Sequence, residues 1–299
     1  MQARRAGAGW SWLMGGFGVA RQHPGRILGA AVLLALCFVL TATTDLVART
    51  GGAAFLAVAG VLAVISGLVS PILYGGFMRV LDATRNGRPA SALGVFEPFR
   101  PGHGGLRLLL FGLCMLIVYA VYAVFFAIVL TTVGRSVGPW YLHTLAQHAS
   151  GTAALAAAPL PPGFGVTVAL ALVFCLFYGG ALAIGTGQVA LRGRSPWNGF
   201  LDGVAGAFKN VLPLVVLALC GLVALIIVSV LLGVIIAILM LVGHFAGATV
   251  GLGLIGLLYV VFALAVVAFV MGVNYAIWRD VAGDTPSRAL DAPVAGAQG

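Results

Sequence analysis

Charged side chains are scarce in this sequence. Only 8% of the 299 residues are Asp, Glu, Lys or Arg, whereas 62% are hydrophobic and the mean hydropathy is +1.13. Soluble globular domains carry charge on about a quarter of their residues. The shortage of charge therefore excludes an ordinary soluble domain and predicts an integral membrane protein.

Long apolar runs account for this composition. A bilayer core about 30 Å thick takes roughly 20 apolar residues per helix, and six runs have no charged residue in their central portions. These runs are residues 27–44, 53–77, 106–133, 164–191, 211–242 and 246–278. The sequence thus predicts an all-α, polytopic transmembrane bundle of six spans. Gly243, His244 and Gly247 mark a break between the last two spans.

Ionisable residues are missing from the centres of these spans. Such residues usually mark proton relays and ion-coupled transport inside a membrane. Their absence argues against a secondary active transporter, while a passive pore or a carrier for apolar molecules stays open.

Catalytic and metal-binding patterns are lacking as well. The sequence has no nucleophile with a recognisable base, no carboxylate pair and no phosphate loop, and His143 and His148 are spaced too unevenly for one helix face. The four cysteines lie in different apolar runs without short paired spacing, which favours small core residues over a metal site or a disulfide. They are Cys37, Cys114, Cys175 and Cys220. We therefore expect no enzyme, no catalytic residue, no metal and no cofactor.

Basic residues outnumber acidic ones, 16 to 7, and their placement predicts an orientation. If the even-numbered spans run inward, every basic residue except Arg49 and Arg135 falls on one side of the membrane. The positive-inside rule then puts both termini in the cytoplasm. The net charge of +9 follows from this topology and from attraction to anionic lipid, so no nucleic-acid partner is expected.

Seven basic residues of the inner connectors form a predicted basic belt. Phe77, Phe96, Phe99 and Trp197 lie beside them in the sequence and are expected to hold them at headgroup depth. We expect the basic belt to contact anionic lipid through several weak interactions, the alternative being that these charges only set the topology. The belt consists of Arg79, Arg85, Arg88, Arg100, Arg192, Arg194 and Lys209.

A short helix is predicted before each pair of spans. Residues 1–26 are interpreted as an amphipathic interfacial helix, rather than as a secretory signal, because apolar residues recur at helical spacing. Ser91 starts a brief aromatic helix that Pro98 and Pro101 are expected to end. Ser195 and Pro196 have the sequence of an N-cap followed by the first helical residue. The apolar residues of the first segment are Trp10, Leu13, Phe17 and Ala20.

The segment after Ser195 carries an apolar stripe at i, i+3, i+4, i+7 and i+11, which predicts an amphipathic helix with that stripe against the bilayer or the bundle. The stripe residues are Trp197, Phe200, Leu201, Val204 and Phe208. In the outer connector, residues 137–150 favour a further short helix anchored by Trp140 and Tyr141.

The whole pattern predicts one transmembrane domain, residues 1–279, built from three units of an interfacial helix plus a helical hairpin. Any six-span protein with basic inner loops would show a similar threefold spacing. The segment Gly185-Thr186-Gly187 and the pair Gly247 and Gly251 are predicted close-packing sites. Residues 280–299 have no apolar periodicity and are expected to form a disordered cytoplasmic tail.

Three stretches of the chain resemble an uncharacterised family of polytopic inner-membrane proteins from proteobacteria. They are GWSWLMGGFGVARQHPGRILG, SPILYGGFMRVLDATRNGRPASALGVFEPF and ALRGRSPWNGFLDGVAGAFKNVLPLVV. The resemblance implies a multi-pass protein of the bacterial inner membrane, and it transfers no catalytic or binding residue. We expect a non-enzymatic protein that interacts with membrane lipids or supports assembly. A permease-like protein or the membrane component of a transporter is the alternative, and protein partners stay open.

Overall fold

The computed structural model describes residues 1–22, 24–50, 53–149 and 159–283, and these residues form an all-α fold. The helices are α1 (Ala8–Gln22), α2 (Pro24–Thr50), α3 (Ala53–Arg85), η1 (Ala92–Phe99), α4 (Gly105–Thr132), α5 (Val137–Ala149), α6 (Phe164–Arg192), α7 (Pro196–Lys209), α8 (Val211–Ala246), α9 (Ala248–Trp278) and η2 (Arg279–Gly283). The predicted all-α class is confirmed. Each of the six predicted runs lies largely within one long helix, but only four of these helices qualify as membrane spans among the described residues.

Four of these helices, α4, α6, α8 and α9, are long and apolar enough to cross a membrane. In α8, all of which is described, the most apolar stretch contains no buried residue. Exposing so much hydrocarbon to water would be costly, so by length and composition these four helices are candidate spans of a multi-pass membrane protein. The apolar part of α2 whose side chains are described, Pro24–Cys37, is shorter than a span.

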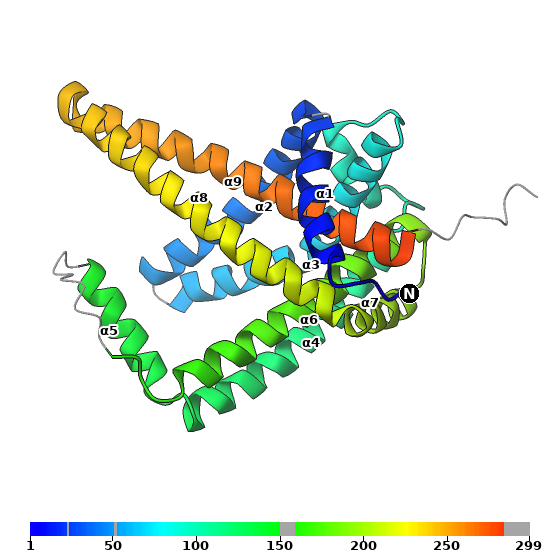
Figure 1. Ribbon diagram of the computed structural model, residues 1–299, viewed down its shortest axis with the longest axis horizontal. Helices are drawn as coiled ribbons and strands as arrows, with labels where there is room; N and C mark the ends of the chain where they lie inside the picture. The colour runs from blue at the N-terminus through cyan, green and yellow to red at the C-terminus, as the bar shows by residue number, and fades with distance from the viewer. Residues whose placement is uncertain (23, 51–52, 150–158, 284–299) are drawn as a thin grey trace, which may run out of the picture.

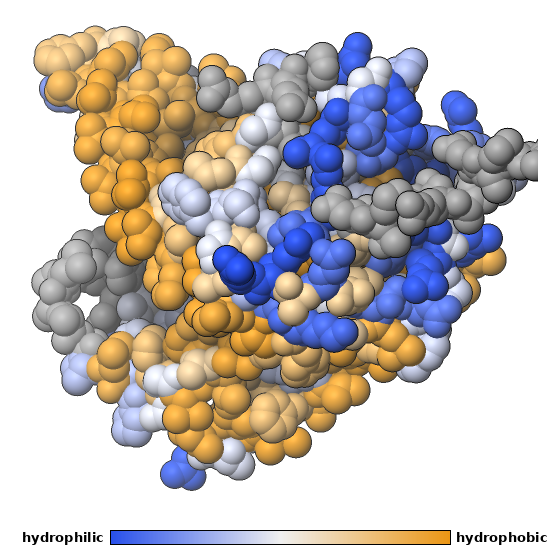
Figure 2. Space-filling view, turned by 45° about the vertical axis from the view of Figure 1, so that its right-hand side comes forward, coloured by the Kyte–Doolittle hydropathy of each residue, from blue (hydrophilic) through white to orange (hydrophobic). Residues whose placement is uncertain are grey.

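The long helices form antiparallel pairs that diverge from a common end (Figure 1). Helices α2 and α3, α4 and α6, and α8 and α9 pack beside one another. The short helices α1, η1, α7 and η2 gather where the pairs converge, which we call the polar end. Hydrophilic residues gather over this end, and hydrophobic residues cover the long helices (Figure 2).

The core lies at the polar end, where α1, α3, α6 and α9 meet. Its fully buried members come from all four helices and include Trp12, Phe77, Ile184 and Tyr275. Contacts between glycines bring the backbones close: a Cβ added at Gly272 would lie 2.8 Å from the carbonyl oxygen of Gly16. Small residues of this kind let membrane helices approach closely.

Helix α7 packs through its glycines and not through its aromatic stripe. Gly199, Gly203 and Gly206 are buried, whereas Trp197 and Phe208 are 58% and 64% exposed. The option that the stripe packs into the bundle is therefore wrong for its ends, because the glycine face fits closer to α6. The ends of the stripe stay exposed, while Phe200 and Val204 in its middle are partly buried against the core.

Helix α1 repeats this arrangement. Its buried face contains Trp12, Leu13 and Gly16, while Trp10 and Phe17 of the predicted apolar face are exposed. The side chain of Ala20 lies outside the described residues. Of the predicted apolar face, Leu13 is buried and the Phe17 ring lies 4.5 Å from that of Phe269 on α9, while Trp10 stays exposed, as a residue of an interfacial helix would be.

The predicted helix ends are mostly correct. Ser91 accepts a hydrogen bond from the backbone N–H of Leu93, and Ser195 accepts one from that of Asn198, so both are N-caps. Pro98 lies inside η1 and is buried, so it does not end that helix. Gly247, with φ of +105°, separates α8 from α9, whereas Gly243 and His244 remain helical.

Close packing is confirmed at Gly185 and Gly251, whereas the prediction is wrong for Gly247, where an added Cβ would meet no atom within 4 Å. A Cβ on Gly243 would lie 2.9 Å from Cα of Gly251, and one on Gly185 would lie 2.9 Å from the carbonyl oxygen of Gly199. At the end of the chain, Asp280 to Gly283 belong to the π-helical turn η2 rather than to a tail. Residues 284–299 lie outside the described part.

Candidate functional site

Asp82 gathers three partners near the end of α3. Its carboxylate accepts hydrogen bonds from the Tyr275 hydroxyl at 2.9 Å and from Asn86 Nδ2 at 3.1 Å, and it pairs with Arg88. Because Tyr275 belongs to α9, this cluster joins α3 to α9. The charge of Arg88 is balanced within the protein.

Arg79 is a bridging residue. Its Nε donates to the carbonyl of Ala190 at 3.1 Å, its Nη2 donates to that of His103 at 2.7 Å, and its Nη1 lies 3.7 Å from Oε1 of Glu97. Ala190 is in the last turn of α6, where helix carbonyls lack intrahelical partners. Arg79 therefore holds α3, α6 and the segment around η1 together.

Two further arginines bind the turn between α6 and α7. Arg194 Nε lies 3.2 Å from Oδ2 of Asp202, and Arg107 Nη1 donates to the carbonyl of Gly193 at 2.9 Å. Gly193 has φ of +65° at the end of α6, a conformation that suits glycine. The positive-inside pattern predicts only a topological role for Arg107, whereas the structure gives it a contact with the turn after α6.

The other four residues of the basic belt are exposed at the polar end. Within the described part of the chain they have no ion-pair partner, so their charges face outward. They are Arg85, Arg100, Arg192 and Lys209. Phe96, Phe99 and Trp197 are exposed near them, but Phe77 is fully buried and cannot anchor the belt at headgroup depth.

Asn210, between α7 and α8, is completely buried and binds the N-terminal segment. Its Nδ2 donates to the carbonyls of Gln2 at 3.0 Å and Gly206 at 2.9 Å, and its Oδ1 accepts from the N–H of Arg4 at 2.8 Å. Arg4 in turn pairs with Asp280 at 3.0 Å. We call this set of contacts the terminal clasp; it places the N-terminal segment and η2 at the same end of the bundle.

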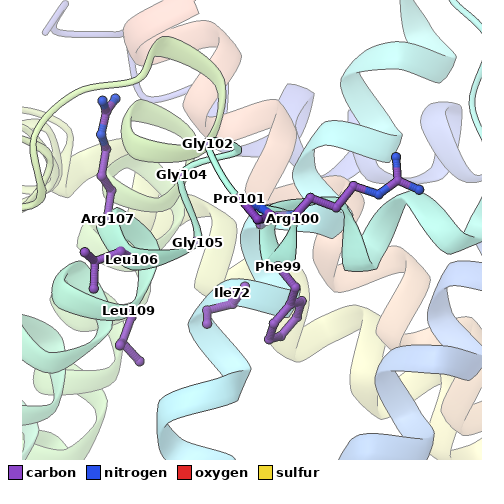
Figure 3. Close-up of a pocket in the computed structure, with 11 residues that line it drawn as sticks. Ile72, Phe99, Arg100, Pro101, Gly102, Gly104, Gly105, Leu106, Arg107 and Leu109 are labelled. Atoms are coloured by element: carbon purple, nitrogen blue, oxygen red, sulfur yellow. The ribbon is translucent and has the colours of Figure 1, made fainter.

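A hollow of about 520 Å³ opens beside the loop that leads into α4. Ile72, Phe99 and Leu109 form an apolar wall. Arg100 on the loop and Arg107 in the first turn of α4 point in different directions (Figure 3). Basic groups and apolar side chains thus meet at this loop. The arrangement is that of a membrane–water boundary.

A second hollow, of about 510 Å³, is lined by Arg79, Arg88, Asp82 and Glu97. Each of its arginines already pairs with one of its carboxylates. The hollow has no net charge from these groups, so it does not attract anions as the outward-facing belt residues do.

The remaining chemistry-bearing residues are dispersed. The described residues contain no cluster of three or more His, Cys, Asp or Glu that would hold a metal, and the four cysteines are unpaired. Helix α5 confirms the predicted short helix of the connector between α4 and α6, and His143 is exposed on it. The side chains of His148, Asp45 and Arg49 lie outside the described residues.

Comparison of the chain with protein-family models, with curated proteins and with solved structures found no match. The resemblance to the proteobacterial family stays an expectation from the three sequence stretches.

Proposed function

We propose that the protein is a non-enzymatic, multi-pass protein of the bacterial inner membrane that holds anionic phospholipid at its cytoplasmic surface. In this proposal the six long helices span the membrane as three hairpins, and the polar end with both termini faces the cytoplasm. Helices α2 and α3, at 27 and 33 residues, are long enough for a bilayer core that takes about 20 residues.

One observation carries the proposal. Arg85, Arg100, Arg192 and Lys209 are exposed, are unpaired within the described residues and lie at the same end as exposed aromatic side chains. A basic residue near an anionic leaflet contributes on the order of 1 kcal/mol of attraction. Arg79, Arg88 and Arg194 are paired with carboxylates, so the unpaired four supply most of the attraction.

The test compares Arg100→Gln with Arg135→Gln. Both changes remove one exposed arginine, but Arg135 follows α4 at the opposite end of the bundle. After purification in a mild detergent, we expect Arg100→Gln to reduce co-purified anionic lipid in a salt-sensitive way, and Arg135→Gln to leave it unchanged. Equal lipid content in the two variants would show that the basic belt sets the topology and does not hold lipid.

A permease for polar solutes would require polar groups along the spans. The polar contacts described above concentrate at one end of the bundle instead, which favours a surface role. Reconstitution in liposomes followed by solute-uptake measurements separates the two functions, since the lipid-holding function predicts no uptake.

A further inference from the structure

An apolar groove of about 320 Å³ runs between α4, α6 and α7. Met115 of α4 and Phe174 and Phe177 of α6 form two sides, and Val204 and Phe208 of α7 form the third. The rings of Phe177 and Phe208 are 4.7 Å apart. The groove is thus built by three helices, and the outward aromatic stripe of α7 contributes one wall.

The lengths of the helices place the groove within the bilayer, near its polar boundary. A hydrocarbon core takes roughly 20 helical residues, which from Phe164 at the far end of α6 reach about as far as Ala183. Counted back from Thr132 on α4, the same length reaches about Leu113. Phe174, Phe177 and Met115 therefore lie inside the hydrocarbon layer, where the surrounding solvent is lipid.

A basic residue comes directly after the groove-lining Phe208 in the sequence. Lys209 comes next after Phe208, ends α7 and is exposed, with no partner among the described residues. Long basic side chains at such positions extend toward the membrane surface. A lipid with its chain in the groove and a negative headgroup would satisfy both features.

We propose that this groove holds one acyl chain of an anionic phospholipid whose headgroup is bound by Lys209. Ligand pockets in proteins span about 300–1,000 Å³, so the groove suits a single chain and not a whole lipid. The inference rests on the proposed membrane embedding and lipid-holding function, but it assigns a discrete site that differs from the weak contacts of the basic belt.

The experiment fills the groove with a larger side chain of the protein itself. Val204→Trp puts a large ring into it, while Leu201→Trp, the matched control, adds the same ring to the exposed side of α7 outside the groove lining. Native mass spectrometry of protein equilibrated with phosphatidylglycerol is expected to show one tightly bound lipid fewer for Val204→Trp and no change for Leu201→Trp. The same lipid count in both variants would mean that only annular lipid is present and would overturn the site.

Two further variants keep the test decisive if Val204→Trp does not fold. Phe208→Ala removes a largely exposed wall of the groove and is expected to lose the same lipid. Lys209→Gln should keep the lipid count but lower the preference for phosphatidylglycerol over phosphatidylcholine about fivefold. An unchanged preference would overturn the headgroup assignment.

Loss of lipid in the groove variants, together with unchanged lipid in Arg100→Gln, would reject the lipid-holding role of the basic belt and leave the groove site in place.

Discussion

The hydroxyl of Tyr275 on α9 donates a hydrogen bond of 2.9 Å to Oδ1 of Asp82 on α3. The two residues are 193 positions apart in the sequence, and their bond ties the third hairpin to the first. The bond to a carboxylate is worth about 1.5–3 kcal/mol, so Tyr275→Phe should lower the free energy of unfolding by that amount. Tyr259→Phe, on the exposed side of α9, is the control. Chemical unfolding in detergent measures both, and equal stabilities would show that the bond contributes nothing.

The terminal clasp predicts a larger loss for Asn210→Ala. The change removes three hydrogen bonds from a fully buried side chain and leaves the carbonyl of Gln2 without its donor. We expect destabilisation of about 2–4 kcal/mol. Asn198→Ala, an exposed asparagine on α7, should change stability by less than about 0.5 kcal/mol. A loss of similar size for both variants would contradict the clasp.

Close packing of α6 and α7 predicts that Gly203 does not accept a side chain. An added Cβ would overlap the carbonyl oxygen of Ala181 and lie 3.2 Å from the backbone nitrogen of Gly185. Gly203→Ala should therefore cost about 1–3 kcal/mol as the helices separate, although alanine is the better helix former. Gly221→Ala, where the same atom meets open space, should not destabilise the protein. Thermal unfolding of the two variants in the same detergent tests this difference.

The proposed topology predicts opposite labelling of two exposed positions. In a variant without native cysteines, Gly138→Cys on α5 should react with an impermeant thiol reagent in intact spheroplasts. Leu93→Cys on η1, 67% exposed at the polar end, should react only after the membrane is permeabilised. The reverse labelling pattern would mean that the protein has the opposite orientation in the membrane.

Hydropathy alone was enough to place the long helices, because a run such as residues 211–242 has no alternative to an apolar helix. Capping was equally local: Ser91 and Ser195 bind backbone N–H groups within three residues. Both features depend on neighbours in the sequence, so one sequence is sufficient to predict them.

The packing faces of α1 and α7 were not predictable in the same way. In a membrane, burial in lipid satisfies an apolar face as well as burial in protein does, so hydrophobicity does not decide which face packs. Gly199 and Gly203 pack because they are small, and the aromatic stripe is left outside. The pairing of Arg79 with Ala190 and of Asp82 with Tyr275 joins helices far apart in sequence. No local pattern distinguishes Arg79 from the unpaired Arg85.

The terminal clasp also sets an order of events during synthesis. The Arg4 side chain binds the carbonyl of Asp280, 276 positions later, so this contact forms only after Asp280 has been made, whereas Asn210 is available earlier to bind the backbone N–H of Arg4. Contacts of such long range form late, and until then Trp12 lacks Asp280 as the acceptor for its indole N–H. A nascent chain halted before Asp280 would therefore keep the contacts of Asn210 with Gln2 and Arg4 but lack those of Arg4 and Trp12 with Asp280.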